Sequence, residues 1–85
     1  MMKTIKQDRY LLEDTIYNNI KAARQDADIH EILDAAEKSE VLDFAWEFSM
    51  GMETLIGKRG MSLSAVQEEK ILIARSLLAG AMSEK

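Results

Sequence analysis

Hydrophobic residues recur at helical spacing in four stretches of the chain, residues 14–23, 28–38, 39–50 and 64–79. The second stretch is the most regular, with apolar side chains at one position and then three, four and seven positions later: Ile29, Ile32, Leu33 and Ala36. Asp28 is a good N-cap for this stretch, and Asp14 or Thr15 can cap the first one. Each of the four stretches is therefore predicted to form a helix.

The last two stretches have broader apolar faces. In residues 39–50 the face consists of Val41, Leu42, Ala45, Trp46 and Phe48. Trp46 and Phe48 are expected in the core, because large apolar residues usually pack. Alternatively, these two side chains and Phe44 form a contact surface for another protein. In residues 64–79, two adjacent rows share the apolar face, one of Val66, Ile73 and Leu77 and the other of Ile71, Ala74 and Leu78.

A glycine-containing connection separates the third and fourth predicted helices. It holds Gly51, Gly57 and Gly60, which mark a loop. The run Thr54-Leu55-Ile56 leans toward β structure but is too short and isolated for a strand. The patterns together predict an all-α fold, a small bundle of about four helices in one domain. Its expected parts are an N-terminal segment at 1–13, three helices in 14–50, the irregular connection at 51–63 and the last helix at 64–80.

Composition fits one small domain and excludes several kinds of chemistry. The 85 residues include no cysteine, which excludes disulfides, thiolate metal sites and cysteine catalysis. A net charge of −4 without a dominant basic patch argues against nucleic acid as a partner. No apolar run approaches the roughly 20 residues that cross a bilayer, and the start lacks the apolar core of a signal peptide. The single histidine, His30, is expected to be a partly exposed helix residue and not a metal ligand.

Ser64 and Gln67 have the spacing of a capping box. In this motif the serine hydroxyl accepts a hydrogen bond from an N–H of the first turn, and the glutamine side chain reaches back to the cap residue. Local sequence therefore predicts a helix that starts at Ser64, with a purely structural role for both side chains. The residues around them support a second interpretation.

Residues 63–78, L-S-A-V-Q-E-E-K-I-L-I-A-R-S-L-L, resemble the signature region of ATP-binding cassette (ABC) ATPases. That region usually reads L-S-G-G-Q, then polar or basic residues, then an apolar stretch ending in A-R-A-L. The matching residues here are Leu63, Ser64, Gln67, Lys70, Ile71, Ile73, Ala74, Arg75, Leu77 and Leu78.

Further matches lie upstream. Residues 7–20, Q-D-R-Y-L-L-E-D-T-I-Y-N-N-I, resemble the Q-loop and following helix of exporter-type members, Q-D-x-x-L-F-x-x-T-I-x-x-N-I. Residues 27–28 are similar to the D-A-x-x-x-E-I helix start, and residues 49–54 to P-x-G-x-x-T. Residues 54–60, T-L-I-G-K-R-G, are similar to the exporter X-loop, T-x-V-G-E-x-G. The matches keep their order over nearly the whole chain, which implies the helical subdomain of such a cassette.

The resemblance implies a part of an ATP-driven membrane transporter. Complete cassettes bind ATP and Mg²⁺ through a P-loop, G-x-x-x-x-G-K-S/T, and an acidic strand end, the Walker B motif, with a catalytic glutamate. Neither motif occurs in this sequence, so the chain alone is expected to need no cofactor and to lack ATPase activity. The implied partners are the rest of the cassette, an opposing cassette and the coupling helices of the transmembrane domain, at the cytoplasmic face of a membrane.

The residues of the signature-like region that differ from the family pattern all weaken the expected phosphate binding. In the family, the serine and glycine amides face the γ-phosphate held by the opposing cassette, and glycine lets the phosphate approach the backbone. Here Ala65 and Val66 replace both glycines, and Glu68 and Glu69 add negative charge. The resemblance therefore implies a degenerate nucleotide-binding turn, in which Ser64 and Gln67 are the residues that remain.

The resemblance also assigns roles outside the signature-like region. Gln7 matches the Q-loop glutamine, which reaches Mg²⁺ and the attacking water in the family; alternatively it is an exposed residue near the chain end. Contact with the transmembrane coupling helices is implied for Thr54, Gly57, Lys58, Arg59 and Gly60. Lys58 stands where exporters often carry glutamate, which reverses the charge there. Alternatively, this segment is a solvated loop between helices.

Two other interpretations stay open. The chain can be a non-catalytic helical protein-interaction module, or an engineered subdomain that stands alone. In a cassette, the first and fourth helices would pack against an α/β core. Without that core their apolar surface is expected to favour self-association.

Overall fold

A computed structural model describes residues 11–80, so the predicted Q-loop residue Gln7 lies outside the described residues. The elements in chain order are α1 (Ile16–Lys21), α2 (Ile29–Lys38), α3 (Val41–Ala45), the 3-10 helix η1 (Gly51–Glu53) and α4 (Ala65–Ala79). Over residues 11–80 the β structure is confined to two isolated bridges, Thr15 with Leu55 and Ile56 with Met61. The predicted all-α fold is confirmed.

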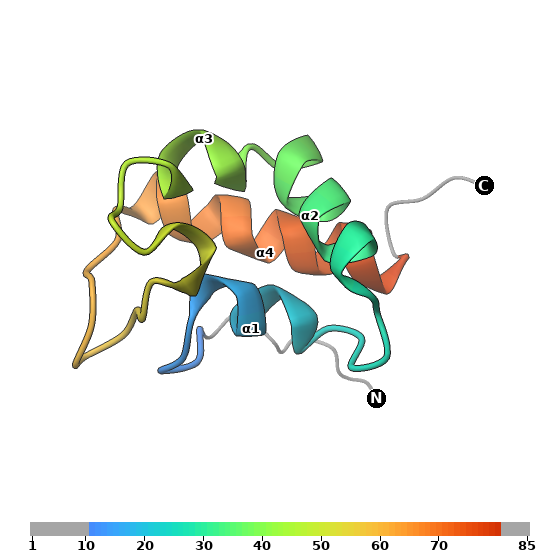
Figure 1. Ribbon diagram of the computed structural model, residues 1–85, viewed down its shortest axis with the longest axis horizontal. Coiled ribbons are helices and arrows are strands. Elements are labelled where there is room, and N and C mark those ends of the chain that lie inside the picture. The colour runs from blue at the N-terminus through green and yellow to red at the C-terminus, as the bar shows by residue number, and fades with distance from the viewer. Residues whose placement is uncertain (1–10, 81–85) are drawn as a thin grey trace, which may run out of the picture.

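The longest helix, α4, runs through the centre of the bundle (Figure 1). It packs against α1 on one side and against α2 and α3 on the other (Figure 1). The start of α1, the loop after η1 and the N-terminus of α4 lie at the same end of the molecule (Figure 1). The start of α2 and the C-terminus of α4 lie at the opposite end. Within residues 11–80, no helix has both the length and the hydrophobicity that crossing a bilayer requires.

One hydrophobic core joins these helices. Ile16 and Ile20 of α1, Ile32 of α2, Val41 of α3 and Ile71 of α4 are completely buried. Burying one such side chain contributes about 1.5–3 kcal/mol. The core therefore fixes α4 against the other three helices along the middle of its length.

The predicted caps begin the first two helices. Thr15 Oγ1 accepts a hydrogen bond from Asn18 N at 2.9 Å. At α2, Asp28 and Glu31 form a capping box, in which Glu31 N donates to Asp28 Oδ1 at 2.9 Å and Asp28 N donates to Glu31 Oε1 at 3.0 Å. The start of each helix is thus set by side chains that satisfy its first N–H groups.

The third helix is shorter than predicted. Residues 39–50 were expected to be one helix, but α3 ends at Ala45, and turns and η1 follow. The core position predicted for Trp46 is wrong, because its side chain is 80% exposed. Trp46 comes two residues after the buried Phe44, and two helical steps turn a side chain to the opposite face. Phe48 is half-buried and packs edge-to-face on Phe44, with ring centroids 6.2 Å apart.

Two other residues of the predicted apolar faces are exposed. Ile29 is 52% exposed and Val66 is 65% exposed. Ile29 is the first residue of α2 and Val66 the second of α4, so both lie in a first turn at an end of the bundle. Their spacing fits the apolar face, but at the helix starts their side chains are not covered by the core.

Candidate functional site

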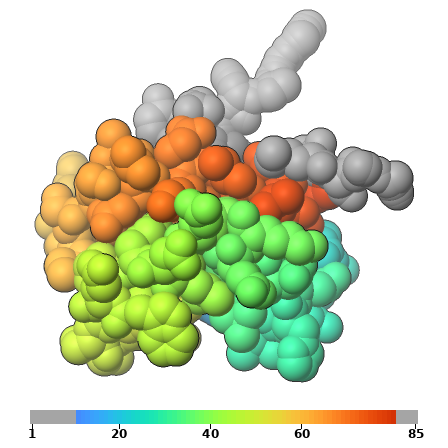
Figure 2. Space-filling view, turned by 90° about the horizontal axis from the view of Figure 1, so that it is seen from above, coloured from blue at the N-terminus to red at the C-terminus, as the bar shows by residue number. Residues whose placement is uncertain are grey.

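The predicted capping box is present at the start of α4. Gln67 N donates to Ser64 Oγ at 3.1 Å, and Ser64 N donates to Gln67 Oε1 at 2.8 Å. Both predicted site side chains therefore have a structural partner in each other. We call residues 64–67 the signature-like turn. It lies at an exposed end of the molecule, beside α3 in the space-filling view (Figure 2).

The signature-like turn presents two backbone donors to solvent. Among residues 11–80, no acceptor takes the amide N–H of Ala65 or Val66, and both residues are exposed. Free N–H groups at the start of a 15-residue helix carry a partial positive charge that suits an anion. The exposed carboxylate of Glu68 in the same turn opposes an anionic ligand, and the branched Val66 side chain narrows access. The donors fit a phosphate, whereas these two side chains do not.

The predicted partner-contact loop is tied to the start of α1. Ile16 N donates to Thr54 O at 3.0 Å, and Ile56 N donates to Asp14 O at 3.0 Å. Within the loop, Met61 N donates to Leu55 O at 2.8 Å. We call residues 54–61 the glycine loop. Its first residues are thus bonded to the start of α1 and its last residue closes back on Leu55, so it differs from a freely solvated connection.

Glycine is required at Gly60 by a close backbone approach. A Cβ atom there would lie 2.2 Å from Leu55 O and 2.5 Å from Leu55 C, which is too close for any side chain. Gly57 has φ 114°, a backbone conformation that favours glycine, and a Cβ there would lie 2.7 Å from Glu13 Cγ. The two glycines therefore set the fold of the loop.

The other predicted loop residues divide by exposure. Lys58 and Arg59 are exposed at the loop tip, where both can reach a partner. Thr54 is buried, and within residues 11–80 its hydroxyl oxygen has no hydrogen-bond partner. Its backbone carbonyl, by contrast, accepts from Ile16 N. Thr54 thus anchors the loop and does not present its side chain to a partner.

A buried residue that was not singled out from the sequence links this end of the molecule to α4. Asn19 of α1 is completely buried. Its Oδ1 accepts from Leu12 N at 2.7 Å and from Arg75 Nη2 at 3.0 Å. Its Nδ2 donates to Thr15 O at 2.9 Å and to Leu12 O at 3.1 Å. An asparagine in a helix carries no local sign of such a role, because its partner Arg75 is 56 residues away in the sequence.

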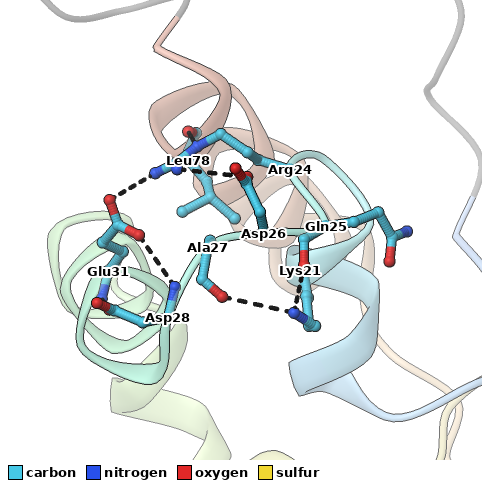
Figure 3. A network of polar contacts seen from close by, with 8 residues as sticks. All are labelled: Lys21, Arg24, Gln25, Asp26, Ala27, Asp28, Glu31 and Leu78. Atoms are coloured by element: carbon cyan, nitrogen blue, oxygen red, sulfur yellow. Dashed lines mark hydrogen bonds and ion pairs between the residues drawn. The ribbon is translucent and has the colours of Figure 1, made fainter.

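The opposite end of α4 is held by a network of charged residues (Figure 3). Arg24 Nε donates to Leu78 O at 3.2 Å, and Arg24 Nη2 donates to Glu31 Oε2 at 2.7 Å. The hydrogen bond from Arg24, with a second from the Asp28 amide, lowers the pKa of Glu31. The guanidinium thus joins the last turn of α4 to the first turn of α2.

A second carboxyl group is perturbed at the other end, beside the glycine loop. Hydrogen bonds from the Asn18 side chain and the Thr15 amide lower the pKa of Asp14. In the described part of the chain, no group of three or more His, Asp or Glu side chains could hold a metal ion. His30 is exposed on α2, as predicted, and lies apart from the signature-like turn.

The protein is thus a helical bundle that carries two features at one end: a capped helix start whose free amides suit an anion, and an anchored glycine loop.

No protein-family model matches the chain. Relatives do match: it is 39% identical over 74 residues to the putative multidrug export ATP-binding/permease protein YgaD of Bacillus subtilis. It is also 39% identical over 74 residues to ATP-dependent lipid A-core flippase 1 of Colwellia psychrerythraea. The mitochondrial iron-sulfur clusters transporter ATM1 of Kluyveromyces lactis is 38% identical over 74 residues.

Each of these matches covers 87% of the chain. The chain spans only 13%, 12% and 10% of the lengths of the Bacillus, Colwellia and Kluyveromyces proteins. It is therefore homologous to a segment of ABC transporter ATP-binding/permease proteins, and by sequence it belongs to that family.

Proposed function

We propose that the chain supplies the helical subdomain of an exporter-type ABC ATP-binding cassette. In that role it joins nucleotide binding to the transmembrane domain at the cytoplasmic face of a membrane. The single observation that carries the proposal is the gathering of the signature-like turn, the glycine loop and the start of α1 at one end of the bundle. The start of α1 thus lies at the same end of the bundle as residues 54–67, and we propose that this end faces a partner cassette and coupling helices.

The proposal includes a weakened role for the signature-like turn. Two exposed amides without a protein acceptor among residues 11–80 support phosphate contact, and Val66 and Glu68 oppose it. The P-loop and the Walker B carboxylates that bind ATP and Mg²⁺ have no counterpart in this sequence. The chain by itself is therefore proposed to be inactive as an ATPase, and its contribution would be made across an interface.

A chimera tests this function. Residues 11–80 would replace the matching segment of the Colwellia flippase, whose ATPase rate is then measured in detergent and in liposomes. We expect the chimera to assemble and to hydrolyse ATP slowly. The double change Ala65→Gly and Val66→Gly is expected to raise the rate tenfold or more, because amide donors to a transferring group each contribute about 10²–10³ in rate.

The matched control for this gain is Ala79→Gly, which places glycine at an exposed position at the other end of the same helix. It should leave the slow rate unchanged. A chimera that does not assemble, or a glycine pair that gives the same rate as the control, would contradict the proposed function.

One observation favours a second function, that of a protein-interaction module. Trp46 is 80% exposed and Met50 is 64% exposed, and large exposed apolar side chains are common at contact surfaces. In this case the isolated chain should self-associate or bind a partner through the α3–η1 side. Sedimentation of the chain and of Trp46→Ser at several concentrations distinguishes this function, which requires association that the substitution weakens.

A further inference from the structure

The five described residues before α1 are the meeting point of three other parts of the chain. We call residues 11–15 the entry segment. From the glycine loop, Ile56 N donates a hydrogen bond to Asp14 O at 3.0 Å. From α1, the Asn19 side chain binds both the N–H and the C=O of Leu12. From α4, Arg75 reaches the same asparagine.

The amide group of Asn19 is oriented by its partners. Its oxygen faces two donors, Leu12 N and Arg75 Nη2, at 2.7 and 3.0 Å. Its nitrogen faces three carbonyls, those of Leu12, Asp14 and Thr15, at 3.1, 3.4 and 2.9 Å. Flipping the amide would place its oxygen against the three carbonyl oxygens and its nitrogen against the two donors. A neutral side chain that both donates and accepts is needed here, and asparagine is that side chain.

Arg75 contacts Asn19 at two points. Its Nε donates to the Asn19 backbone carbonyl at 2.8 Å, and its Nη2 donates to Asn19 Oδ1 at 3.0 Å. A planar guanidinium that bonds twice fixes direction as well as distance, which the single ammonium of lysine cannot do. The position of α4 relative to α1 is thereby set at a defined residue.

The remaining link is α4 itself. Arg75 and the signature-like turn lie on the same unbroken helix, roughly 16 Å apart for 11 residues at 1.5 Å per residue. The helix contains neither glycine nor proline between Ala65 and Ala79. Such a helix moves as a rod, so a shift at Arg75 displaces Ser64.

We propose that Asn19 and Arg75 are positioning residues that transmit the position of the entry segment and the glycine loop to the signature-like turn. The path runs from the glycine loop to Asp14, through the entry segment to Asn19, and through Arg75 along α4. We call the Asn19–Arg75 contact the joint. The inference rests on the proposed function only for the use of the joint in a transporter, because the contact itself is a property of this chain. It assigns to one pair, the buried Asn19 and the half-buried Arg75, the coupling between the glycine loop and the signature-like turn.

Distance measurements between spin labels test the joint on the whole 85-residue chain. The chain has no cysteine, so Glu13→Cys with Glu68→Cys places one label on the entry segment and one on the first turn of α4. Glu37→Cys with Glu68→Cys measures α2 against α4 and bypasses the joint. Asn19→Ala is expected to broaden and shift the first distance distribution and to leave the second unchanged.

A control variant separates positioning from general stability. Ile32→Val removes one methylene from a fully buried core residue and lowers stability without touching the joint. It should leave both distance distributions narrow. In hydrogen exchange, the Leu12 amide should exchange about tenfold faster in Asn19→Ala than in Ile32→Val, as expected for the loss of one hydrogen bond.

Two conservative variants keep the test informative if Asn19→Ala does not fold. Arg75→Lys keeps the charge and removes the double contact, and Asn19→Asp keeps the shape and removes the donors. Both should broaden the 13–68 distance distribution and leave the 37–68 distribution unchanged. If the 13–68 distribution is as narrow in these variants as in Ile32→Val, the pair is only a structural contact and the inference is wrong. These outcomes do not depend on the ATPase rate of the chimera, so the two proposals can fail separately.

Discussion

The two ends of α4 are held in different ways. At the C-terminal end, Leu78 is buried and its carbonyl accepts a hydrogen bond from Arg24, which also pairs with Glu31 of α2 (Figure 3). At the N-terminal end, the side-chain hydrogen bonds of the cap join Ser64 and Gln67, residues of the same turn. The side-chain hydrogen bonds at the C-terminal end therefore join different helices, whereas those of the N-terminal cap stay within one turn. The exposed, locally capped turn can face a partner.

The largest expected effect comes from truncating a buried side chain of α4. Ile71→Ala should lower the free energy of unfolding by about 2–5 kcal/mol, because it removes a completely buried side chain and leaves a cavity. Val66→Ala, on the same helix but 65% exposed, should change it by less than about 0.5 kcal/mol. Urea unfolding of both variants measures the contrast. Similar losses for the two would mean that the signature-like turn is as firmly packed as the rest of α4.

The next effect tests how the glycine loop is anchored beside the exposed end. Gly60→Ala should cost about 1–3 kcal/mol, because its Cβ would collide with the Leu55 carbonyl and shift the loop backbone. Gly51→Ala is the control, since nothing lies within 4 Å of its Cβ position and only its φ of 54° opposes the change. Thermal unfolding gives the stabilities. NMR shifts of Asp14 and Ile56 should move in Gly60→Ala and stay in place in Gly51→Ala.

Much of this comparison could be predicted from local sequence, and the reasons are physical. The capping box at Ser64 and Gln67 and the cap at Asp28 act within a single turn, so residue type and spacing were sufficient. The all-α fold followed from apolar spacing. Trp46 was placed wrongly, because a broad apolar face does not reveal that a helix stops after five residues.

The tertiary contacts that hold α4 could not be predicted from local sequence. The pairs Asn19–Arg75 and Arg24–Leu78 are 56 and 54 residues apart, and no spacing rule connects them. The collision that makes Gly60 necessary involves a backbone carbonyl, which has no sequence signal of its own. Resemblance to exporter motifs marked Asn19, Gly60 and Arg75 as matching residues but gave no physical role for Asn19 or Arg75. The structure supplies that role.

A smaller effect is expected at the locally capped end. Ser64→Ala removes the acceptor for Gln67 N and should cost about 1 kcal/mol of stability, the usual value of an N-cap. Ser62→Ala, at an exposed position just before the helix, is the matched control and should be neutral. Denaturant unfolding with amide exchange at Glu68 measures both. Because the change is confined to the first turn, protection at Ala74 and Leu78 should follow global stability alone.

The smallest effect concerns the charged network at the C-terminal end of α4. Arg24 holds the pKa of Glu31 below its ordinary value, so ionised Glu31 favours the folded chain. This contribution is fully present above the ordinary glutamate pKa of about 4.3 and is lost as the pH falls through the lowered folded pKa. It should be small and sensitive to salt, because the pair is solvent-accessible, with 38% and 45% of the Arg24 and Glu31 side chains exposed. Unfolding midpoints between pH 7 and pH 3 should therefore fall less steeply in Glu31→Gln than in the unaltered chain.

Asp14 is the control, because its pKa is also lowered but it lies at the other end of the molecule. Asp14→Asn should reduce the loss of overall stability in acid and leave the pH dependence of amide exchange at Leu78 unchanged. If Glu31→Gln leaves the pH dependence at Leu78 intact, Arg24 fastens α4 through its bond to the Leu78 carbonyl alone, without help from α2.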